Sequence, residues 1–121
     1  MINFHAHIYF ENKNLYQAHK LKELATSEIF FDSCRIYEKP VGPHPYGMIE
    51  LHFNAFNYNN AIKWIKNHRN SYSVLIHQVT GDDIVDHTNE VLWLGEVLPL
   101  DFKFFELIKH HPDLQIHHKK I

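Results

Sequence analysis

The segment NFHAHIYF at residues 3–10 constrains the fold most strongly, because its side chains alternate in character with a period of two. Such alternation is typical of a β-strand whose two faces meet different surroundings. One face carries Phe4, Ala6, Ile8 and Phe10, and the other carries His5, His7 and Tyr9. The segment therefore predicts a sheet that is covered by apolar elements on one face and presents imidazoles on the other.

Two amphipathic helices are predicted to supply the apolar cover. Residues 15–29 and 57–70 carry apolar side chains at steps of three and four, which is the spacing of one helix face. The stripe of the first helix is Leu15, Ala18, Leu21, Ala25 and Ile29, and that of the second is Ala61, Ile62 and Ile65 with Trp64 beside it.

Three further strands are predicted at residues 33–38, 47–55 and 72–79. The segment KPVGPHPYG at residues 39–47 is rich in proline and glycine and predicts an irregular loop. After a TGDD turn come the tripeptide DHT at residues 86–88, an apolar VLWLG and a short helix expected at residues 101–109.

The order of elements is therefore β-α-β-β-α-β with a short C-terminal extension. This order predicts a single α+β domain over residues 1–121, with a ferredoxin-like antiparallel sheet and both helices on one face. In that arrangement the first strand lies between the third and the fourth. His7, Glu50 or His52, and His77 then become neighbours about 5 Å apart on the face without helices.

Histidine is unusually frequent, with 12 residues against 12 lysines and arginines together. Several imidazoles and a carboxylate on one face suit a divalent metal, since two His and one carboxylate are typical of Fe(II) and three His suit zinc or iron. The alternative is that this face is wetted by solvent and polar for that reason. His44, between two prolines, has the further alternative of an ordinary tight turn.

Charge and cysteine content limit the partners and the compartment. The formal net charge is −2, which makes nucleic acid and anionic membranes poor partners. The single cysteine, Cys34, suits a reducing compartment, and neither a signal peptide nor a membrane span is recognisable. We expect a cytoplasmic protein.

Four separated segments resemble the signature segments of the DOPA 4,5-dioxygenase family. They are HAHIYF at residues 5–10, RIYEKPVGPHP at 35–45, SVLIHQVTGD at 73–82 and DHTNEVLWLG at 86–95. The resemblance implies a ferredoxin-like domain that pairs into a dimeric α/β barrel. It also implies metal-dependent extradiol cleavage of DOPA or a related catechol by O2.

The resemblance, position by position, singles out His7, His44, His77, His87 and Arg35. On this basis we expect Fe(II), with zinc possible, on His7, His44 and His77, with Glu50 as a carboxylate ligand in place of His44 if His44 lies too far away. His87 is the expected acid–base group, and Arg35 is expected to bind a substrate carboxylate. The remaining candidates are His5 and Tyr9 for catalysis and His52 for substrate binding.

Three other functions fit the same residues. A zinc site could serve hydrolysis or isomerisation, and a dimeric α/β-barrel protein could hold a small aromatic molecule without catalysis. A structural protein could use histidine titration to sense pH. A homodimer is expected in any case, because two stacked sheet faces would enclose the site.

Overall fold

The computed structural model describes residues 1–88, 91–101 and 103–104. Short 3-10 turns at Asn12–Asn14 and Ala55–Asn57 precede the two longer helices. The remaining elements, in chain order, are β1 (Asn3–Phe10), α1 (Leu15–Thr26), β2 (Ser33–Tyr37), β3 (Gly47–Asn54), α2 (Tyr58–His68), β4 (Val74–Gln78), α3 (Asp83–Thr88) and β5 (Leu92–Leu94).

The strands form one antiparallel sheet in the order β2-β3-β1-β4-β5. The first four strands have the ferredoxin-like order, which confirms the predicted fold. β1 is paired along its length with β3, from Asn3 opposite Asn54 to Phe10 opposite Gly47, and it is paired on its other side with β4. A central strand paired on both sides has its register fixed twice, so the faces of its side chains are well determined.

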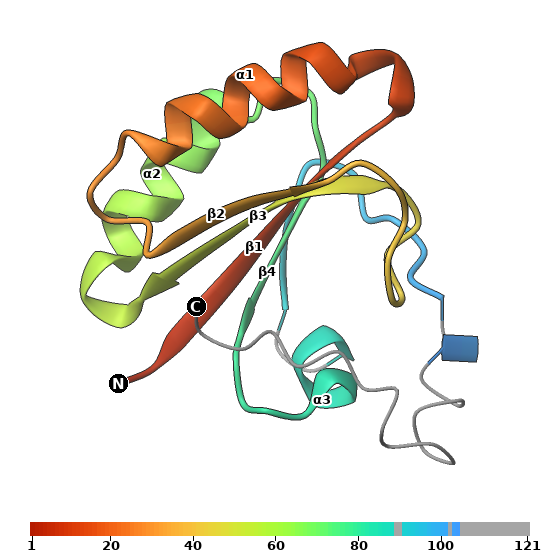
Figure 1. Cartoon of the computed structure of the whole chain (residues 1–121). Coiled ribbons are helices and arrows are strands. Elements are labelled where there is room, and N and C mark those ends of the chain that lie inside the picture. Colours follow the sequence, from red (N-terminus) through yellow and green to blue (C-terminus); the bar gives the residue numbers. More distant parts are fainter. Residues whose placement is uncertain (89–90, 102, 105–121) are drawn as a thin grey trace.

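Helices α1 and α2 lie on one side of the sheet and α3 lies on the other (Figure 1). The two longer helices pack their apolar stripes on the apolar face of the strands, where burial of such side chains supplies most of the driving force for folding. The core includes Ala6 and Ile8 of β1, Ala18 and Leu21 of α1, Ile49 and Leu51 of β3, Ala61 and Ile65 of α2, and Val74 and Ile76 of β4.

The first helix is shorter than predicted and does not bury Ile29, whose side chain is 95% exposed. The hydroxyl of Thr26 donates to the carbonyl of Lys22, and that of Ser27 donates to the carbonyl of Leu24. Hydroxyl side chains that bond to the preceding turn compete with the helical pattern, so α1 ends before its apolar stripe does.

Two elements were missed by the sequence prediction, namely α3 and β5. The DHT tripeptide lies at the end of α3, and the apolar VLWLG contains β5, which pairs with β4. The helix expected at residues 101–109 falls largely outside the described residues.

The sequence suggested that the sheet face away from α1 and α2 is bare, but in the structure this face is covered. Its apolar members Tyr9, Met48 and Leu75 are buried together with Leu100, and its imidazoles are buried as well. The alternative reading, in which this face is wetted by solvent, is therefore wrong. None of the helices in the described residues is both long and apolar enough to cross a bilayer.

Candidate metal centre

Five segments bring buried histidines to the second face of the sheet. β1 supplies two, β3 and β4 supply one each, and the proline-rich loop and α3 supply one each. All six are buried, as is the carboxylate that lies among them. The set is His5, His7, His44, His52, His77 and His87, with Glu50.

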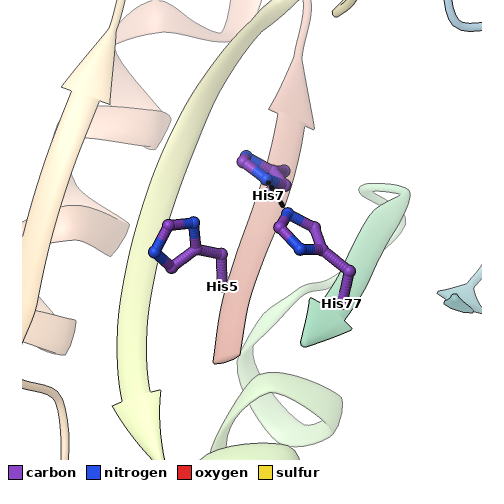
Figure 2. Close-up of side chains that lie close together, drawn as sticks. All are labelled: His5, His7 and His77. Atoms are coloured by element: carbon purple, nitrogen blue, oxygen red, sulfur yellow. Dashed lines mark hydrogen bonds between the residues drawn. The ribbon is translucent and has the colours of Figure 1, made fainter. Parts of the chain in front are cut away.

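The closest contact in this cluster joins two imidazole nitrogens. Nε2 of His7 lies 2.9 Å from Nε2 of His77, and Figure 2 shows the two rings facing each other from neighbouring strands. Two lone pairs at this distance repel unless a proton or a cation lies between them. Nitrogens bound to one metal ion at about 2.1 Å and at right angles to each other would be about 3 Å apart, so the spacing suits a shared ion.

Hydrogen bonds fix the tautomers of two of these rings. Nδ1 of His77 donates to the carbonyl of Gln78 at 3.0 Å, and Nδ1 of His87 donates to the carbonyl of Asp83 at 2.7 Å. A carbonyl can only accept, so in the neutral rings the proton is on Nδ1 and the lone pair is on Nε2. This is the arrangement in which a metal-binding histidine is usually held.

His7 has a similar arrangement on its Nδ1 side. That nitrogen lies 3.1 Å from Sδ of Met48 and 3.6 Å from Oε2 of Glu50. A carboxylate behind Nδ1 favours a proton there and makes Nε2 a better ligand. The sequence did not point to Met48, although its place opposite Tyr9 in the β1–β3 ladder follows from the strand alternation.

His44 differs, because its Nδ1 faces a hydroxyl that can donate or accept. Oη of Tyr9 lies 2.7 Å from Nδ1 of His44. Burial, and then the charge of Glu50, raise the pKa of Tyr9 far above its usual range, so the phenol keeps its proton at neutral pH. The hydrogen bond can therefore run in either direction, from the Tyr9 hydroxyl to Nδ1 of His44 or from a protonated Nδ1 to the hydroxyl oxygen.

The third part of the site is a carboxylate with two imidazoles. Oε1 of Glu50 lies 2.6 Å from Nε2 of His52, and the rings of His5 and His52 are stacked with their centroids 3.7 Å apart. His5 is directly opposite His52 in the ladder between β1 and β3.

Among the described residues, three sets of side chains bring ligand atoms within 4.8 Å of one another. Nitrogen ligands with at most one carboxylate suit zinc or iron and are unfavourable for calcium and magnesium, which prefer oxygen. The donor chemistry thus fits the metal that the sequence led us to expect. The sets are His5, His7 and His77; His7, His44 and His87; and His5, Glu50 and His52.

The structure brings together most of the residues selected from the sequence. The register puts His77 opposite His5, and the His77 ring reaches its diagonal neighbour His7. Arg35 is opposite Glu50 in the ladder between β2 and β3, on the same face, but its side chain is exposed.

Two cavities lie near opposite ends of β1, and of these the second is lined by one of the six buried histidines. One, of about 260 Å³, is lined by Tyr9, Tyr46 and Ser73 among others. The second, of about 250 Å³, is lined by His77, Thr80 and Asp86 among others. Either is large enough to hold part of a single aromatic ring with its substituents.

Comparison with known proteins links this geometry to one family. The model of the Dopa 4,5-dioxygenase family matches residues 4–104. An uncharacterized 21.2 kDa protein of Botryotinia fuckeliana is 36% identical over 88% of this chain, and a DOPA 4,5-dioxygenase of Amanita muscaria is 26% identical over 93%. The chain spans 64% and 56% of the lengths of these relatives. The crystal structure of a proposed dioxygenase from Nostoc punctiforme matches with a TM-score of 0.80 and 31% identity, over 89% of this chain and 94% of the other.

Proposed function

The chain belongs to the Dopa 4,5-dioxygenase family, and from this premise we propose that it is a metal-dependent extradiol dioxygenase acting on a catechol. In this reaction the bond between one hydroxyl-bearing carbon and its ring neighbour without a hydroxyl is broken. Both atoms of O2 enter the product. The observation that carries the proposal is the 2.9 Å approach of the His7 and His77 nitrogens inside a buried group of imidazoles.

We propose that His7, His77 and His87 bind the ion through Nε2. His7 belongs to two of the three sets described above, and His77 and His87 each belong to one of these two; the ring centroids of His77 and His87 are 4.6 Å apart. Nδ1 of His77 and Nδ1 of His87 each donate to a backbone carbonyl, which holds these rings in the tautomer that a metal requires. Nδ1 of His7 lies 3.1 Å from Sδ of Met48, with the Glu50 carboxylate 3.6 Å away, and both favour a proton on Nδ1. When bound, Fe(II) would supply adjacent positions for the two catechol oxygens and for O2.

Proton transfer is proposed for His44 together with Tyr9. Because the phenol can donate to Nδ1 of His44 or accept from it, the ring can carry its Nε2 proton or give it up without losing its partner. The sequence suggested the opposite assignment, with His44 as a ligand and His87 as the acid–base group. The hydrogen-bond partners of the two Nδ1 atoms are the reason for exchanging the roles.

The substrate is proposed to be a catechol that carries a carboxylate. Arg35 is kept as the expected anchor, because a guanidinium binds a carboxylate through two parallel hydrogen bonds and this side chain is exposed on the sheet face of the site. The cavity of about 260 Å³ that Tyr9 lines is the proposed route to the metal.

The roles of His44 and His87 can be separated by measuring metal and turnover in the same samples. Protein reconstituted anaerobically with Fe(II) is assayed by oxygen uptake and by the yellow ring-opened product, with DOPA and simpler catechols. His87→Ala and His7→Ala should lose bound iron and activity together. His44→Ala should keep its iron and lose about 100-fold or more in kcat.

The matched control is His19→Ala, which removes an exposed imidazole that pairs with Glu38 outside the cluster. It should change neither quantity. Loss of iron from His44→Ala with retention by His87→Ala would restore the assignment made from the sequence. Wild-type protein that binds only zinc, or no metal, and consumes no oxygen with any catechol would contradict the proposed function and favour a hydrolase or a binding protein.

A further inference from the structure

The side chains of His5, Glu50 and His52 form a second group of possible ligands, of which only Glu50 enters the proposed function, by orienting His7. They share no residue with the set formed by His7, His44 and His87, yet their ligand atoms also lie within 4.8 Å of one another. All three are buried on the second face of the sheet, with 3%, 1% and 8% of their surfaces exposed.

The local sequence explains how these residues meet. Glu50 and His52 are two residues apart on β3, so they point to the same face, and His5 is the ladder partner of His52. The group consists of two imidazoles and one carboxylate, a ligand set that first-row divalent metals favour.

Charge gives a reason for a cation at this position. A buried carboxylate is costly unless it is paired with positive charge. Glu50 holds His52 at 2.6 Å through Oε1, and the His52 ring is stacked on His5 at 3.7 Å. One divalent cation at this position would neutralise the carboxylate and use one lone pair from each of the two stacked rings.

The two oxygens of Glu50 also separate this position from the metal centre. Oε1 faces His52, and Oε2 faces Nδ1 of His7 at 3.6 Å, while Nε2 of His7 is turned towards His77. The carboxylate and the His7 ring therefore lie between the two sets of ligands. One ion cannot use both ends of the His7 ring.

We propose that His5, Glu50 and His52 bind a second divalent cation of the zinc class, in addition to the ion of the metal centre. Glu50 connects the two positions, since one of its oxygens binds the second ion and the other orients His7. This proposal goes beyond the proposed function, because it does not depend on ring cleavage.

Titration of the metal-free, untagged full chain with Co²⁺ tests the proposal. Cobalt is counted by elemental analysis after gel filtration, and visible absorption follows its coordination. The wild-type protein should bind two equivalents. His52→Ala and His5→Phe should each bind one, and the phenyl ring of the second variant preserves the stacking area. His87→Ala should also bind one equivalent, but with the absorption spectrum of the second position.

Histidines elsewhere provide the controls. His19→Ala should still bind two equivalents, since His19 is exposed and outside the group. The sequence also contains His110, His111, His117 and His118, so a variant with glutamine at these four positions is titrated in parallel and should also bind two.

Three results would overturn the second site. They are a single equivalent in the wild-type protein, two equivalents in folded His52→Ala and His5→Phe, and loss of the second equivalent only when the four C-terminal histidines are replaced. Circular dichroism identifies the folded variants. Failure of the proposed function would appear differently, as retention of the first equivalent by His7→Ala and His87→Ala or as absence of oxygen uptake.

Discussion

The histidines of the candidate metal centre differ in the group that each Nδ1 atom contacts. Carbonyl oxygens of Gln78 and Asp83 hold His77 and His87 in one tautomer, and a hydroxyl leaves His44 with two. The same side chain can therefore serve as a ligand at one position and as a proton donor at another. The division of roles depends on these local contacts more than on the number of imidazoles.

Tyr9→Phe tests the hydrogen bond that we assign to proton transfer. Removing the hydroxyl leaves Nδ1 of His44 without the phenol that now lies 2.7 Å away. We expect iron content to stay at the wild-type level and kcat to fall about 100-fold, since a positioned proton donor contributes about that much or more. Stability should fall by about 1 kcal/mol.

The control for this variant is Tyr16→Phe, because the Tyr16 side chain is 71% exposed and lies on α1. Steady-state kinetics and metal analysis of both proteins are compared. Loss of iron from Tyr9→Phe would mean that the phenol supports a ligand, and wild-type turnover would mean that it takes no part in proton transfer.

Alternation along the strands was sufficient to predict which residues share the site face. It selected His7, His77 and Glu50 from three separate strands, and the described contacts join all three. It could not predict tautomers, because these depend on carbonyl groups whose positions follow from the folded backbone. The contact between His44 and Tyr9, on which the role proposed for His44 rests, could not be predicted for the same reason.

At the level of elements, the two longer helices owe their places to apolar stripes that pack on the sheet. Ile65 in α2 is completely buried in the core, whereas Ile29, expected to extend the stripe of α1, is 95% exposed. The two residues have the same side chain in opposite surroundings. Replacing each of them therefore measures how much burial of an isoleucine contributes to the free energy of unfolding.

Ile65→Ala should lower the free energy of unfolding by about 2–5 kcal/mol, because it removes buried methyl groups and leaves a cavity. Ile29→Ala should change the free energy of unfolding by less than about 0.5 kcal/mol. Urea denaturation followed by circular dichroism measures both. Equal losses would mean that the side chain of Ile29 is buried in solution, for example against another chain.

The prediction of elements was accurate where a pattern was long and failed where it was short. β1 and α2 were located almost to the residue, since periods of two and of 3.6 extend over many positions. α3 has six residues and β5 has three, which is too few for a period to be recognised. The position of α3 against the sheet, which brings His87 to the site, depends on tertiary packing.

At the level of the whole molecule, the sheet ends at β2 on one side and at β5 on the other. End strands have unpaired backbone groups that can pair with another chain. A homodimer stays a prediction, although the stacked bare faces first suggested for it do not exist, because that face is buried within one chain.

Light scattering coupled to gel filtration tests this prediction at micromolar concentration. The expected mass is twice the 14.5 kDa of one chain. A mass of one chain at all concentrations would contradict the dimer and leave the proposed metal centre unaffected, since all of its proposed ligands come from one chain.

The double pairing of β1 has a consequence for how faults in this protein arise. Side chains of a strand point to one face of the sheet or to the other. A shift of β1 by one residue would therefore turn His5 and His7 towards the helices and the apolar residues of β1 towards the opposite face. Small misalignments of the metal centre through this strand are thereby excluded. In any one molecule, β1 either holds both the histidines and the apolar core residues in place or loses both sets together. A sample in which some molecules have a shifted register would therefore be a mixture of intact molecules and molecules without a functional site.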